Sequence, residues 1–153
     1  MELDQYIAVE NIAVGINATD KASAIAQMVG HASNVKSLNA EYITKLLLAR
    51  EQKKSSGYGK QIAILHLIDR SIPEISVTIG TFKSPLQWDA VDGKLVTVAA
   101  LILSPHRSVK EYIAVIPYVC KALAEDTVRA SIVSMCTAAQ VMTVLNSLKG
   151  KYA

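Results

Sequence analysis

The chain has 153 residues, of which 51% are hydrophobic and 19% are charged, and its net charge at pH 7 is +3. This length and composition are typical of a globular chain with a buried core, and we expect residues 1–153 to form a single domain. The basic residues are scattered and form no stripe with interleaved aromatic side chains, so the sequence argues against nucleic acid as a partner.

Membrane insertion, disulfides and metals are also not expected. The longest strongly apolar run, Leu95–Leu103, is too short to span a bilayer, and the acidic N-terminus lacks the apolar core of a signal peptide, which predicts a soluble, cytoplasmic protein. Cys120 and Cys136 lie in apolar surroundings without a CxxC spacing, and we expect both to be buried free thiols. No spacing of acidic, histidine or cysteine residues predicts a metal site, and nothing in the sequence calls for a cofactor.

The first third of the chain predicts two helices. Residues 1–18 read as a loose or partly extended lead-in. Thr19 is placed to cap a helix over 20–33, and Asn39 to cap a second helix over 40–53. The face of the second helix that we expect to point inward comprises Tyr42, Ile43, Leu46 and Leu47.

Three strand-like runs follow, over residues 61–66, 75–82 and 95–103. The first and the third are almost continuously apolar, as in strands that are covered on both faces, whereas the second alternates between apolar and polar residues. Turn residues set off a short piece over 86–90 between the second and third runs.

The last third predicts helices. Ser108 and Glu111 have the spacing of a capping box, and Pro117 predicts a kink in the helix that follows. A short helix is expected from about residue 126 to 135, and a second capping box, Thr137 with Gln140, opens a final helix. This order of elements predicts an α/β fold: a sandwich with one central mixed sheet flanked by helices on both faces.

A candidate site surrounds His66, an ionisable ring at the end of an apolar run. Most such histidines are neutral residues of the core or its rim. Two features favour a functional role: the loop over residues 55–59, whose N–H groups and hydroxyls are suited to cradle an anion, and Arg50, whose guanidinium is suited to hold phosphate oxygens. A ring nitrogen that attacks phosphorus beside such groups predicts phosphoryl transfer.

The segment LLAREQKKSSGYGKQIAILH resembles the phosphorylation-site segment of a known family. It is similar to the fructose/mannitol-class (type 2) enzyme IIA domains of the bacterial phosphoenolpyruvate sugar phosphotransferase system, which include nitrogen-regulatory relatives. NATDKASAIAQMV, SPLQWDAVDGKLVTVAALILSP and the C-terminal helices are also similar, so the resemblance covers nearly the whole chain. The residues that match the family's motif are Arg50, Glu51, Ser55, Gly57, Gly59, Ile62, Ala63, Ile64 and His66.

The resemblance implies a phosphohistidine carrier, a component of a phosphotransferase. His66 would accept a phosphoryl group from the histidine phosphocarrier protein, with Arg50 as the second catalytic residue. The group would then pass to a transporter B domain or serve as a mark for a regulatory target protein. The phosphate-binding residues would be Ser55, Ser56, Gly57, Gly59 and Tyr112.

Four positions depart from the family's pattern. Leu65 replaces the proline before the histidine, Gln61 replaces a glycine, Leu67 follows the histidine where glycine is common, and Tyr112 stands where a second histidine is frequent. We do not assume that His106 substitutes for that histidine. These departures favour an alternative function, a IIA-like regulatory binding module with little or no phosphotransfer. The sugar, the downstream target and the oligomeric state are left open.

For two further side chains the sequence leaves two possible roles open, and for a third it predicts a role in packing. Glu51 is expected either to orient Arg50 or to lie at the surface, and Tyr58 either flanks the site or contacts a partner. Trp88 is expected to pack at a sheet edge.

Overall fold

The structure, a computed structural model, describes residues 2–152. Five strands and five α-helices form within this range, together with three short 3-10 turns. In chain order the elements are η1 (Leu3–Gln5), η2 (Val9–Asn11), β1 (Ile12–Ile16), α1 (Lys21–Val35), α2 (Ala40–Lys53), β2 (Gly57–Gly59), β3 (Ile62–Ile68), β4 (Ser76–Leu86), β5 (Val96–Ser104), η3 (His106–Ser108), α3 (Val109–Ala124), α4 (Asp126–Ser134) and α5 (Ala138–Asn146).

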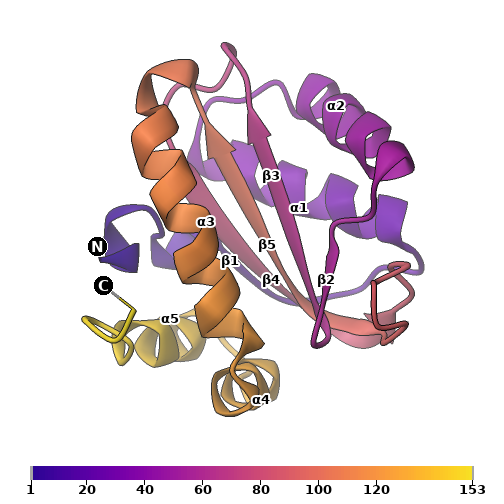
Figure 1. Ribbon diagram of the computed structural model, residues 1–153, viewed down its shortest axis with the longest axis vertical. Helices are drawn as coiled ribbons and strands as arrows, with labels where there is room; N and C mark the ends of the chain where they lie inside the picture. Colours follow the sequence, from indigo (N-terminus) through magenta and orange to yellow (C-terminus); the bar gives the residue numbers. More distant parts are fainter. Residues whose placement is uncertain (1, 153) are drawn as a thin grey trace.

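The strands of the described chain form one mixed sheet in the order β1-β4-β5-β3-β2. β1 runs parallel to β4 and β3 runs parallel to β5, whereas β4 pairs with β5 and β2 pairs with β3 in antiparallel fashion. Helices α1 and α2 cover one face of the sheet, and α3, α4 and α5 lie on the other (Figure 1). The expected α/β sandwich with a central mixed sheet is confirmed.

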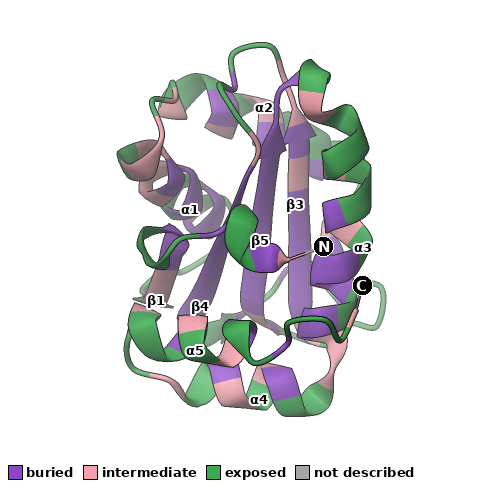
Figure 2. Cartoon of the chain, turned by 90° about the vertical axis from the view of Figure 1, so that its left-hand side faces the viewer, coloured by how far each residue is buried: buried purple, intermediate pink, exposed green. Residues whose placement is uncertain are grey.

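Alternation along the strands divides the interior into two cores, because successive side chains of a strand point to opposite faces. In β3, Ile62 and Ile64 pack with α3, whereas Ala63, Leu65 and Leu67 pack with α1 and α2. The central strands are buried along most of their length, and exposed residues gather on the outer sides of the helices (Figure 2).

The N-terminal segment differs from the expectation of a loose lead-in. Residues Ile12–Ile16 form the edge strand β1, which pairs with β4, more than sixty residues further along the chain. The first helix is capped by Asp20, whose carboxylate accepts the Ser23 N–H at 2.8 Å, and not by Thr19. Asp20 is the residue with extended backbone immediately before the helix, as a side-chain cap requires.

The other predicted caps have mixed outcomes. The side chain of Asn39 caps α2, and Thr137 with Gln140 forms the predicted capping box of α5. Ser108 makes no capping hydrogen bond with its side chain, so that prediction is wrong. Ser108 ends the turn η3 with ψ at 22°, which is not the extended backbone of a typical N-cap. Helix α3 continues through Pro117.

Two predicted buried side chains are exposed. Tyr42 is 41% exposed, since its hydroxyl donates to Asp69 at the surface, and the inner face of α2 is formed by Ile43 and Leu47. Cys120 is buried as expected, but Cys136 is exposed in the turn between α4 and α5. No helix within residues 2–152 has the length and apolar character needed to cross a membrane.

Candidate functional site

His66 lies in the second half of β3, on the face of the sheet that packs against α3. The partner strand β2 pairs only with Ile62 and Ala63, so the ring lies beyond the part of β3 that β2 covers. Its Nδ1 is 2.7 Å from the hydroxyl oxygen of Tyr112 on α3, and the two rings meet edge to face with their centroids 5.9 Å apart. Strand and helix together therefore fix a half-buried imidazole.

Burial and charge both keep this imidazole neutral. Burial lowers the pKa of His66 below its ordinary value of 6.5, and the positive charge of Arg50 lowers it further. A neutral ring has a nitrogen lone pair at neutral pH, so it needs no separate base to act as a nucleophile. Burial also raises the pKa of Tyr112, while the charge of Arg50 and its hydrogen bond to the phenol oppose that rise. The phenol therefore stays protonated.

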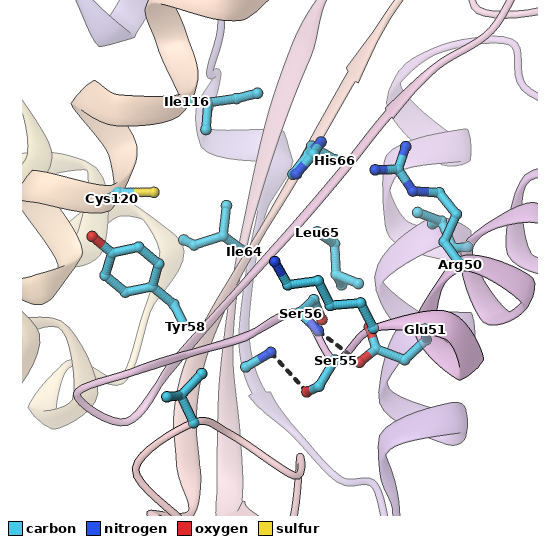
Figure 3. A pocket seen from close by; sticks show the side chains of 14 residues that line it. Arg50, Glu51, Ser55, Ser56, Tyr58, Ile64, Leu65, His66, Ile116 and Cys120 are labelled. Carbon is cyan, nitrogen blue, oxygen red and sulfur yellow. Dashed lines mark hydrogen bonds between the residues drawn. The ribbon is translucent and has the colours of Figure 1, made fainter.

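Arg50 is in the last turn of α2, and its side chain reaches toward His66 (Figure 3). The two residues line a pocket of about 430 Å³ that opens beside the edge of the sheet. Ile116 and Cys120 of α3 line the opposite side of this pocket, as Figure 3 shows. A planar guanidinium at this point is suited to bind the oxygens of a phosphoryl group that reaches the imidazole.

The serines of the loop after α2 are held by Glu51, Lys21 and Trp88. The buried Glu51 carboxylate accepts the Ser56 N–H at 2.7 Å and the Lys21 ammonium at 3.2 Å. The Ser55 hydroxyl donates to the Trp88 carbonyl at 2.6 Å, and the Trp88 indole N–H donates to the Ser56 hydroxyl at 2.8 Å. Since the Ser56 oxygen serves as the acceptor of that bond, its own proton is available to a ligand in the pocket.

Two glycines fit this loop for different reasons. A Cβ on Gly57 would lie 2.7 Å from the Cα of Ala90, so only glycine allows the two backbones to approach this closely. Gly59 has φ of +100°, in the region that favours glycine. Gly59 is the last residue of β2, and the tight turn that follows it contains Lys60 and Gln61.

The structure brings most of the predicted site residues together. The pocket is lined by His66, Arg50, Ser55, Ser56 and Gly57 among others. Gly59 lies in the β2–β3 hairpin and is not among the lining residues, and the Tyr112 hydroxyl contacts the His66 ring. Within the described chain, His106 lies in η3 and is not among the residues that line the pocket.

Of the four positions that depart from the family's pattern, only Tyr112 contacts the His66 ring. Leu65 and Leu67 both belong to the core beneath α1 and α2, on the face of the sheet opposite to the His66 ring. Leu67 therefore continues the strand and does not shield His66. Gln61 occupies a turn position with φ of +66°, where glycine would be unstrained.

The sequence did not reveal how the loop is anchored. Glu51 was expected to orient Arg50 or to lie at the surface, but it is 8% exposed and binds the backbone of the loop. No sequence pattern around Lys21 of α1 predicted its ion pair with Glu51. The hydrogen bond of Trp88 could have been expected, because a buried indole N–H usually finds an acceptor.

Comparison with known proteins identifies relatives along nearly the whole chain. The profile of the family described as "Phosphoenolpyruvate-dependent sugar phosphotransferase system, EIIA 2" matches residues 5–148. A nitrogen regulatory protein from Bradyrhizobium diazoefficiens is 20% identical over 148 residues, which cover 95% of each chain. The 2-O-α-mannosyl-D-glycerate-specific EIIABC component from Escherichia coli is 25% identical over 73% of this chain, but the match spans only 17% of that longer protein.

Solved structures share the fold. The nitrogen regulatory protein IIA-Ntr from Neisseria meningitidis superposes with a TM-score of 0.84 at 21% identity, covering 92% of this chain and 97% of that one. The mannitol IIA enzyme from Escherichia coli, in its complex with the phosphorylated mannitol IIB enzyme, superposes with a TM-score of 0.76 at 18% identity, covering 92% and 97%. From the match over residues 5–148, the chain belongs to the EIIA 2 family of the phosphoenolpyruvate-dependent sugar phosphotransferase system.

Proposed function

We propose that the protein is a phosphohistidine carrier in which His66 accepts a phosphoryl group and passes it to an acceptor protein. The observation that carries the proposal is the position of His66: a half-buried ring with a lowered pKa, in the same pocket as Arg50 and the loop over residues 55–57. Family membership supports the same reaction class.

The transfer assigns a role to each group of the site. A lone pair of the neutral imidazole attacks phosphorus as the bond to the donor breaks. The charge on the equatorial oxygens is stabilised by Arg50 and by the Ser56 hydroxyl, which the Trp88 indole N–H holds in place. The pocket's open side gives the donor and acceptor proteins access in turn.

We propose two protein partners, a phosphoryl donor and a phosphoryl acceptor. The donor we propose is the histidine phosphocarrier protein, another protein with a phosphorylated histidine. The acceptor we propose is a transporter B domain, because the mannitol IIA enzyme forms a complex with phosphorylated mannitol IIB. A regulatory role that uses the phosphorylation state itself is the second candidate, favoured by the relative named nitrogen regulatory protein that matches 95% of this chain.

A phosphorylation assay tests the proposal. We expect phosphoenolpyruvate, enzyme I and the histidine phosphocarrier protein of the same host to add one acid-labile, base-stable phosphate to the wild-type protein, detected by intact-protein mass spectrometry. His66→Ala is expected to abolish this addition, because it removes the nucleophile. His31→Ala and His106→Ala are matched controls and should keep the phosphate, since neither histidine lines the pocket.

The negative result is also informative. A folded wild-type protein that stays unmodified beside active partner enzymes would refute phosphotransfer. The alternative function, a IIA-like regulatory binding module, would then be favoured, and its target protein would be sought with the unphosphorylated protein.

A further inference from the structure

The hydrogen bond between His66 and Tyr112 fixes one nitrogen of the imidazole. The Tyr112 hydroxyl lies 2.7 Å from Nδ1, in the direction from which phosphorus would have to approach that atom. Tyr112 belongs to the first turns of α3, whose buried residues Val115 and Val119 anchor the helix to the sheet. The phenol is therefore held rigidly, and Nδ1 is closed to a partner protein.

We propose that Tyr112 is a positioning residue that accepts the Nδ1–H of His66, holds the ring in this tautomer and so leaves the Nε2 lone pair as the nucleophile. This inference rests on the proposed phosphoryl transfer. The contact alone is compatible with two tautomers, because a hydroxyl both donates and accepts. If Tyr112 donated to Nδ1, the ring proton would be on Nε2, and neither nitrogen would have a free lone pair. Only the tautomer in which Tyr112 accepts leaves a reactive nitrogen.

The proton balance of the transfer agrees with this assignment. The Nε2 lone pair forms the new bond to phosphorus while the donor's N–P bond breaks. The donor's phosphoimidazolium leaves as a neutral imidazole, and His66 becomes the phosphoimidazolium without gaining or losing a proton. Its Nδ1–H carries part of the new positive charge, and the Tyr112 oxygen remains its acceptor throughout.

A neutral acceptor suits this role better than a charged one. A carboxylate at the same place would stabilise the imidazolium and so protonate the nucleophile before the reaction. A second cation would oppose the positive charge that the ring gains on phosphorylation. The phenol is protected from ionisation by its burial, so it accepts the Nδ1–H without either effect.

The tautomer can be measured without any phosphorylation, by ¹H–¹⁵N long-range correlation on ¹⁵N-histidine-labelled protein at neutral pH. We expect the His66 Nδ1 of the wild type to be protonated and Nε2 to be unprotonated. Tyr112→Phe keeps the aromatic ring and removes the hydroxyl, and should shift the tautomer ratio about fivefold toward Nε2–H, as the loss of one ordinary hydrogen bond predicts. Tyr118→Phe, which removes another hydroxyl from α3 at a site bonded to Leu148, should leave the ratio unchanged.

The phosphorylated protein gives a second readout. We expect the wild type to carry phosphate on Nε2, identified from the ¹⁵N shifts and couplings to phosphorus, and Tyr112→Phe to accept phosphate several-fold more slowly. A wild type with Nε2–H as its main tautomer, or a Tyr112→Phe ratio equal to that of the wild type, would overturn the positioning role. The predicted tautomers in a protein that accepts no phosphate would uphold the role and refute the proposed transfer alone.

Discussion

The chemistry of single residues in this site depends on keeping one imidazole neutral. Burial is the main cause of the lowered pKa of His66, and the charge of Arg50 adds to it. The same guanidinium that is suited to bind phosphate oxygens therefore also keeps the nucleophile unprotonated. The two effects have the same sign, so Arg50 favours the reactive state of the ring both before and during the proposed transfer.

Replacing Arg50 separates these effects. In the wild type we expect the His66 ring to titrate below pH 6.5 when followed by NMR, so that phosphate acceptance persists as the pH falls to that lowered value. Arg50→Gln should raise the pKa of His66 but leave it below 6.5, because burial remains, and should slow acceptance by about 10²-fold. Lys53→Gln, which removes a neighbouring charge that does not line the pocket, is the control. An unchanged His66 titration in Arg50→Gln would contradict the charge effect.

At the scale of elements, the β2–β3 hairpin positions the strand that carries His66. Its turn places two residues other than glycine, Lys60 and Gln61, at φ of 55° and 66°. These are left-handed conformations that side chains with a Cβ adopt at a cost. The Asp92 carboxylate offsets part of this cost in free energy by accepting the Lys60 N–H at 2.8 Å. The turn therefore keeps its shape through contacts from outside the hairpin.

A glycine in this turn should stabilise the protein. We expect Gln61→Gly to raise the free energy of unfolding by about 0.5–1 kcal/mol. Glycine adopts the left-handed region without strain, and this gain exceeds the loss from the greater conformational entropy of the unfolded chain. Gln52→Gly, the same change in the right-handed backbone of α2, should lower it by up to about 1 kcal/mol. Urea denaturation of both variants measures the difference. A loss of stability in Gln61→Gly would show that the turn is not strained.

At the scale of the whole molecule, the sheet separates the His66 ring from the core beneath α1 and α2. His66 faces α3 and the pocket, whereas Leu65 and Leu67 are buried beneath α1 and α2. The His66 ring and the side chains of Leu65 and Leu67 thus lie on opposite faces of one strand. Substitutions in the core beneath α1 and α2 should therefore change the free energy of unfolding but leave the pKa of His66 almost unchanged.

Leu67→Ala tests this separation. We expect the free energy of unfolding to fall by about 2–5 kcal/mol, since the substitution leaves a cavity in a packed core. The pKa of His66 and the extent of phosphorylation should stay as in the wild type at temperatures where the variant is folded. Val133→Ala, at an exposed position of α4, should change the stability by less than about 0.5 kcal/mol. A shift in the His66 titration of Leu67→Ala would mean that Leu67 does reach the ring.

The sequence by itself determined the elements whose signals are local. Asn39 and Thr137 mark helix starts by their own side chains, and apolar runs mark β3 and β5. The loop after α2 and the histidine at the end of β3 were also evident, because a few adjacent residues define them.

Tertiary structure alone decided the features that join distant segments. The strand β1 is only five residues long, includes Gly15 at a positive φ, and is ordered by pairing with β4. Glu51 is buried because Lys21 and the Ser56 N–H neutralise and bind its carboxylate, and the Tyr112 hydroxyl meets a ring 46 positions away. Local patterns set which residues can form a helix, strand or turn, but a hydrogen bond between them depends on how the whole chain packs.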